Sequence, residues 1–119
     1  MSSTPKVALL LVDPYNDFLH PDGKITARLQ DSLTHNNAVK HMQHAVSVAR
    51  KHRVPIFYGL HQQWNPKTFQ GWKHMTGSNQ RQEEIHFFEE GSFGAEIYEG
   101  LEPDPANGDV VVSKHWNSK

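Results

Sequence analysis

The sequence predicts an α/β fold built around a parallel sheet, and two observations lead to this prediction. Three short apolar segments, at residues 7–12, 54–60 and 110–113, have the length of strands and are unbroken rather than alternating. Such runs are typical of strands buried on both faces of a parallel sheet. A helical pattern lies between the first two segments, and a longer, turn-rich excursion separates the second from the third. Strands that alternate with helices are typical of parallel α/β folds.

The first strand, VALLLV at residues 7–12, stops at Asp13 and Pro14. Proline disfavours a helical conformation in the residue before it, and residues 16–23 are rich in turn-forming side chains. The first strand therefore ends by presenting the carboxylate of Asp13.

An amphipathic helix is expected at residues 37–52, between the first two strands. Its apolar side chains recur at steps of three and four residues, which places them on one face. Basic side chains near residue 52 suit the negative end of the helix dipole. The apolar positions are Val39, Met42, Val46 and Ala49.

The second strand, at residues 54–60, has Pro55 near its beginning, where proline is tolerated. Residues 61–90 are polar but contain several large aromatic side chains, and loops of this length are uncommon unless they form lids or interfaces. Packing onto the sheet is expected for these aromatic residues, with a substrate-covering or interface role as the alternative. A short helix is expected at residues 95–101, before the third strand. The aromatic residues of the excursion and its end are Trp64, Trp72, Phe87, Phe88 and Phe93.

Composition limits the function classes. The 119 residues suffice for one domain, and 12 basic against 13 acidic residues give a net charge of −1. Nucleic acid and anionic membranes are therefore not expected as partners. No apolar segment approaches the roughly 20 residues of a membrane span, and residues 1–6 lack the apolar core of a signal peptide, so a cytoplasmic location is expected. The absence of cysteine excludes disulfides, thiolate metal sites and a cysteine nucleophile supplied by these residues.

Two charged residues follow strands. Asp13 comes after the first strand and Lys114 after the third, and open parallel sheets place their sites beyond the carboxyl ends of strands. A carboxylate and an ammonium group that meet there can move protons and stabilise an anionic nucleophile. The alternative interpretation is a turn carboxylate and a solvated lysine.

Several motifs, in order along the chain, resemble those of the isochorismatase-like cysteine hydrolases. They are LLLVDPYNDF at 9–18, VPIF at 54–57, GSFGAEI at 91–97, LEP at 101–103 and GDVVVSKHWN at 108–117. Because these motifs extend over nearly the whole chain, the resemblance is more specific than any one of them.

The resemblance implies a Rossmann-like three-layer sandwich around a six-stranded parallel sheet, of which residues 1–119 would form a domain incomplete at its carboxyl end, after the third strand. It also implies a catalytic triad of aspartate, lysine and cysteine, in which Asp13 and Lys114 match the first two members. The family aspartate accepts the thiol proton and the lysine supports the thiolate. We take Phe18, His61 and His115 as candidate substrate-binding residues.

The sequence departs from this family pattern in three places, one of which is Tyr15, where many members have glutamine. The catalytic cysteine has no counterpart, because the 119 residues contain none. Nicotinamidases of the family carry an Asp-x-His metal pair after the second strand, whereas residues 58–64 read YGLHQQW without an aspartate. No metal or other cofactor is therefore expected, and nothing in the sequence selects isochorismate, whose hydrolysis breaks a vinyl ether.

Two other metal patterns have simpler interpretations. His41 and His44 are spaced so that two imidazoles could share an ion, but they lie beside or behind the apolar helix face and are expected to be solvated. Asp13 and Asp17 could suggest a phosphohydrolase, but such sites need an acidic residue at the position of Tyr15.

Two functions from different classes are therefore predicted as alternatives. The first is an isochorismatase-like hydrolase of a small amide-type or related substrate, whose nucleophile comes from a complementary carboxyl-terminal segment or a second polypeptide. The second is a non-catalytic binding or assembly module, or a remnant, with the same fold. An open apolar sheet edge is expected to pair with such a segment or with a second copy of the chain.

Overall fold

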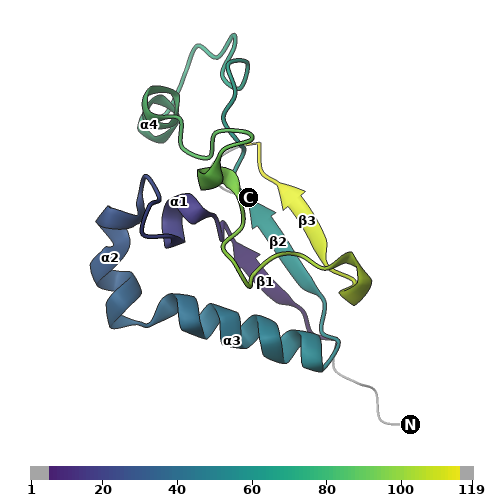
Figure 1. Ribbon diagram of the computed structural model, residues 1–119. Helices are drawn as coiled ribbons and strands as arrows, with labels where there is room; N and C mark the ends of the chain where they lie inside the picture. The colour runs from purple at the N-terminus through teal and green to yellow at the C-terminus, as the bar shows by residue number, and fades with distance from the viewer. Residues whose placement is uncertain (1–5, 116–119) are drawn as a thin grey trace.

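The computed structural model describes residues 6–115, and its centre is a three-stranded parallel sheet (Figure 1). The strands are β1 (Leu9–Val12), β2 (Ile56–Leu60) and β3 (Val110–Ser113), in the spatial order β1-β2-β3. Leu11 pairs with Tyr58, which in turn pairs with Val111. All three strands therefore end at the same edge of the sheet. The predicted α/β class and parallel sheet are confirmed.

Within residues 6–115, four helices and two short 3-10 helices accompany the sheet. The helix expected at residues 37–52 is confirmed as α3, which follows the shorter helix α2. Neither α1, α2 nor α4 was expected, because these segments are rich in polar residues. The bounds are α1 Asn16–Leu19, α2 Thr26–His35, α3 Ala38–Lys51, α4 Gly77–Ile85, η1 Phe93–Ala95 and η2 Pro105–Asn107.

The prediction of a helix at residues 95–101 is wrong. Only the single turn η1 forms, and the chain is extended from Glu96, whose φ and ψ are −79° and 147°. The backbone there pairs with the loop after β1: Asn16 N–H donates to the Glu96 carbonyl, and Tyr98 N–H donates to the Pro14 carbonyl, both at 2.9 Å. These backbone groups are used between segments and are not available for a helix.

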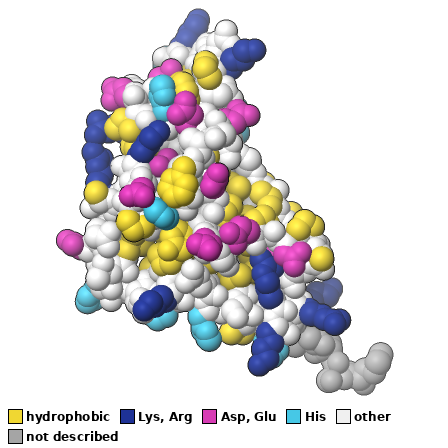
Figure 2. Space-filling model, viewed as in Figure 1, with side chains coloured by type: hydrophobic (Ala, Val, Ile, Leu, Met, Phe, Trp, Pro, Cys, Tyr) yellow, Lys and Arg dark blue, Asp and Glu magenta, His cyan; other side chains and the backbone are white. Residues whose placement is uncertain are grey.

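The hydrophobic core lies on one face of the sheet, beneath α3 and the loop segment 96–102 that crosses the strands (Figure 1). Ile56 and Leu101 are fully buried, and Tyr58 is 1% exposed. Figure 2 shows this side of the molecule, where acidic side chains lie among the visible hydrophobic ones. The buried cluster consists of Leu11, Val46, Ala49, Ile56, Tyr58 and Leu101.

The opposite face of the sheet is bare within residues 6–115. Leu10 is 59% and Val112 54% exposed, so the expectation that the strands are buried on both faces is wrong for these residues. The physical reason is that α3 and segment 96–102 both pack on one side. The side chains that alternate onto the bare face are Leu10, Val12, Phe57, Val110 and Val112, and we call this set the open sheet face.

The buried carboxylate of Asp109 connects the start of β3 to neighbouring segments by hydrogen bonds. The Asp109 side chain is fully buried and accepts hydrogen bonds from Arg50 Nη1 at 2.8 Å and from the backbone N–H of Ile56 at 3.0 Å. It also accepts from the Asp104 N–H and the Asn107 amide. Burial alone raises the Asp109 pKa, but these four donors outweigh burial and lower it to about 2.

None of the helices within residues 6–115 has the length and apolar character needed to cross a bilayer.

Candidate active site

Asp13 and Lys114 meet at the carboxyl ends of the strands. The backbone of each residue continues the hydrogen bonding of the sheet. Asp13 N–H donates to the Gly59 carbonyl at 3.1 Å, and Lys114 N–H donates to the Leu60 carbonyl at 2.7 Å. Lys114 Nζ then donates to Asp13 Oδ2 at 2.8 Å. The two side chains are 17% and 5% exposed. The structure thus brings together the two residues that were predicted to be catalytic.

The backbone of Asp13 has the left-handed conformation, with φ of +53°. Residues with a Cβ rarely adopt it, and it costs on the order of 1–3 kcal/mol. Pro14 follows, and the Tyr15 N–H donates back to the Asp13 carbonyl at 2.8 Å, which closes a tight turn. Strained backbone of this kind is concentrated at functional sites.

One oxygen of the Asp13 carboxylate remains available to accept a proton. Oδ2 is bonded to Lys114, whereas Oδ1 is buried and accepts no hydrogen bond from the described part of the chain. A buried polar atom without a partner is unfavourable by about 1–3 kcal/mol and calls for a functional or structural reason. A carboxylate oxygen that accepts no other hydrogen bond can take a proton from a group placed within hydrogen-bond distance of it.

Tyr15 joins the loop after β1 to the loop after β2. Its hydroxyl donates to the His61 carbonyl at 2.8 Å, and the side chain is 1% exposed. Burial raises the Tyr15 pKa to about 12; a hydrogen bond with Gln63 opposes this shift and the charge of Asp13 adds to it. The phenol therefore stays neutral and acts as a fixed donor that positions His61 near the site.

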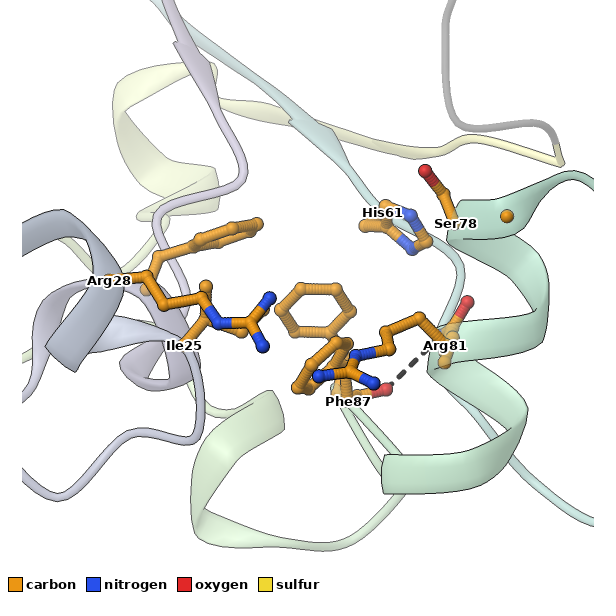
Figure 3. Close-up of a pocket in the computed structure, with 10 residues that line it drawn as sticks. Ile25, Arg28, His61, Ser78, Arg81 and Phe87 are labelled. Carbon is orange, nitrogen blue, oxygen red and sulfur yellow. Dashed lines mark hydrogen bonds between the residues drawn. The ribbon is translucent and has the colours of Figure 1, made fainter.

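A cavity of about 450 Å³ lies between α2 and α4, and Figure 3 shows its walls. His61 and Phe18 line it, and the His61 ring lies 4.9 Å from the ring of Phe88. Phe18 also lines a smaller cavity of about 260 Å³ whose wall includes Asp13. Phe18 and His61 are therefore placed where a ligand could contact them, and their role in substrate binding stays a prediction.

His115 lies apart from both cavities. It is exposed, and its ring centroid is 5.4 Å from that of Trp72. His115 lines neither the cavity that contains His61 nor the one that contains Asp13. Its role as a substrate-binding residue stays a prediction without a cavity to support it.

The aromatic residues of the excursion divide between packing and the cavity wall. Trp64 is buried, stacks on His86 with centroids 3.5 Å apart and donates from Nε1 to Glu83 at 2.8 Å. Phe88 is 2% exposed and, like Phe87, lines the larger cavity, whereas Phe93 is 46% exposed. The expectation that packing dominates is met by Trp64 and Phe88.

Asp17 has a structural role. Its carboxylate accepts from the Phe88 N–H at 2.8 Å and from the Lys24 N–H at 3.0 Å, and the side chain is almost fully buried. These bonds tie α1 to the segment before η1. His41 and His44 are both exposed, as expected. Among residues 6–115, no group of three or more His, Asp or Glu side chains is arranged around a common point for a metal ion.

Arg28, Ser78 and Arg81 also line the larger cavity, and the sequence analysis missed them. Arg28 lies on α2, and Ser78 and Arg81 lie on α4, two helices that were not expected. The four-residue spacing of Ile25, Leu29 and Leu33 is the pattern that could have indicated α2.

The comparisons with known proteins agree with this architecture. The family model described as the isochorismatase domain matches residues 7–119. No curated protein matches the chain significantly. The matched range includes all three strands and both members of the Asp13–Lys114 pair, so the chain belongs to the isochorismatase family.

Proposed function

We propose that the protein is a hydrolase of a small amide-type substrate, in which Asp13 and Lys114 form the charged part of the active site. The observation that carries the proposal is the 2.8 Å pair between Lys114 Nζ and Asp13 Oδ2, with the second carboxylate oxygen buried and available. The family assignment gives the reaction class, hydrolysis.

The chemistry follows from these two groups and one thiol. Asp13 Oδ1 accepts the thiol proton, and the ammonium group of Lys114 stabilises the thiolate. The thiolate adds to the amide carbonyl, the C–N bond breaks, and the amine leaves with a proton from Asp13. Water then hydrolyses the thioester, which regenerates the thiol and releases the carboxylic acid.

The thiol must come from outside these residues, because the 119 residues contain no cysteine. We propose that a complementary segment or a second polypeptide supplies it. The open sheet face and the unpaired edges of β1 and β3 within residues 6–115 offer an apolar surface for such a partner. A second copy of the chain is the other partner that fits this surface.

The absence of cysteine also permits a direct test. The purified chain is incubated with a 4-nitroanilide and a small thiol such as 2-mercaptoethanol, and release of 4-nitroaniline is followed. We expect thiol-dependent release that falls on the order of 100-fold in Asp13→Asn, because general base catalysis contributes at least that much. Asp31→Asn on exposed α2 is the matched control and should leave the rate unchanged.

The result that contradicts the proposal is thiol-dependent release that is equal in the wild type, in Asp13→Asn and in buffer. That outcome favours the alternative function, a binding or assembly module with the same fold. Two observations support the alternative: the absence of cysteine and the open sheet face.

A further inference from the structure

We propose that the cavity between α2 and α4 binds the carboxylate of an aromatic acid, and that this carboxylate belongs to the substrate. The inference rests on the proposed function and deepens it, because it names the substrate class: an amide that carries an aromatic or similarly flat apolar body and a carboxylate. Three properties of the cavity support it: its charge, the helix that begins there and its aromatic side chains.

Two arginines define the charge of the cavity. Figure 3 shows the guanidinium groups of Arg28, from α2, and Arg81, from α4, directed into the space between the two helices. No aspartate or glutamate is among the residues that line the cavity. Arg81 Nη1 lies 3.8 Å from the carboxylate of Glu84, and both side chains are exposed on α4. Arg28 makes no ion pair with the described residues, so its charge is available to a ligand.

The amino-terminal turn of α4 adds to this positive potential. Gly77 and Ser78, its first two residues, line the same cavity. The Thr76 side chain caps the Asn79 N–H and leaves the N–H groups of Gly77 and Ser78 without a helical partner. Exposed N–H groups at the start of a helix favour an anion, and here they act together with the two guanidinium groups.

Most of the remaining lining residues are apolar, and His61 and Gln82 are the polar ones among them. Phe18, Phe87 and Phe88 line the cavity, and the rings of Phe18 and Phe88 lie 5.0 Å apart. A free phosphate would leave these rings without a partner, whereas a benzoate-like ligand places a ring against them and its carboxylate between the arginines. The observations therefore favour an aromatic carboxylate over an inorganic anion.

The position of Phe18 relates this cavity to the catalytic pair. Phe18 lines the cavity of the two arginines and also the smaller cavity that contains Asp13. A substrate held by its carboxylate near Arg28 and Arg81 would therefore extend along Phe18 toward Asp13. In this arrangement, the arginines bind one end of the substrate and Asp13 acts at the other.

Calorimetric titration of the purified chain, without thiol, tests the proposal with benzoate, benzamide and inorganic phosphate as probes. Benzoate should bind about tenfold more tightly than benzamide, because a charge-assisted hydrogen bond is lost with the neutral amide. Arg28→Met and Arg81→Met should each lower the affinity for benzoate about tenfold. Lys40→Met, which removes an exposed cation on α3, is the matched control and should not change the affinity.

Equal affinity for benzoate and benzamide, failure of benzoate to bind, or an unchanged affinity for benzoate in both arginine variants would overturn the proposal. If phosphate binds as tightly as benzoate, the cavity is a site for inorganic anions, and the proposal of an aromatic carboxylate is wrong. Because Arg28 and Arg81 are exposed, their variants should keep the wild-type unfolding midpoint. Asp13→Asn should bind benzoate normally, so the failure of this inference and the failure of the proposed hydrolase are distinguishable.

Discussion

Replacement of Asp109 by asparagine should destabilise the domain and remove a defined part of its pH dependence. In the wild type, one carboxylate oxygen accepts from Ile56 N–H and Asn107 Nδ2, and the other from Arg50 Nη1 and Asp104 N–H. An asparagine keeps the shape but loses the charge, and its NH₂ group would face two donors. The buried guanidinium contact of Arg50 also loses its counter-charge.

The magnitude follows from the pKa of the Asp109 carboxyl group. The folded protein lowers it from 3.8 to about 2, and each pKa unit corresponds to about 1.4 kcal/mol. The charged form therefore contributes about 2–3 kcal/mol to the free energy of unfolding. Because the folded pKa is depressed, this contribution is present above about pH 4 and is lost as the pH falls toward 2.

Urea unfolding at a series of pH values is the appropriate assay. We expect Asp109→Asn to lose at least about 2 kcal/mol near neutral pH, and the difference between wild type and variant to shrink between pH 4 and pH 2. Asp31→Asn, at an exposed position of α2, should change neither the free energy of unfolding near neutral pH nor its dependence on pH. A constant difference across this pH range, or no difference at all, would refute the role assigned to the Asp109 carboxylate.

Two further predictions concern packing and association. Gly94→Ala would place a methyl group 2.3 Å from Asp17 Oδ1 and should lower the free energy of unfolding by about 1–3 kcal/mol, whereas Gly77→Ala, whose Cβ would meet nothing within 4 Å, should not. Urea unfolding of both variants tests this prediction. An unchanged free energy of unfolding in Gly94→Ala would contradict the close contact between Gly94 and Asp17. The open sheet face should drive self-association of the isolated chain, so Phe57→Glu should weaken association about tenfold in sedimentation velocity. Val48→Glu on the outside of α3 serves as the control, and a wild type that stays monomeric at all concentrations would refute the prediction.

The parts of the fold with simple periodicity could be predicted from the sequence. Unbroken apolar runs indicated the three strands, and three- and four-residue spacing indicated α3. The positions of Asp13 and Lys114 at the ends of β1 and β3 then predicted their proximity, since parallel strands end at one edge. Sequence reasoning succeeded here because the site depends on strand topology rather than on loop conformation.

The cavity could not be predicted in the same way. The sequence of α4, GSNQRQEEI, has almost no apolar residues, and its stability depends on the reciprocal cap between Thr76 and Asn79. Residues 95–101 have the composition of a short helix, but the antiparallel bridge between Tyr15 and Ile97 uses the backbone that a helix would need. Contacts between distant segments decide both cases, and local patterns in a single sequence do not contain that information.

The most direct test of the central claim, that Asp13 and Lys114 act as one catalytic unit, is a double-mutant cycle on thiol-dependent anilide cleavage. Asp13→Asn, Lys114→Met and the double variant are compared with the wild type under identical conditions. We expect each single variant to lose on the order of 100-fold and the double variant to lose about the same, because groups that act together are strongly non-additive. Losses that multiply, to about 10⁴-fold in the double variant, would show two independent residues and contradict the account.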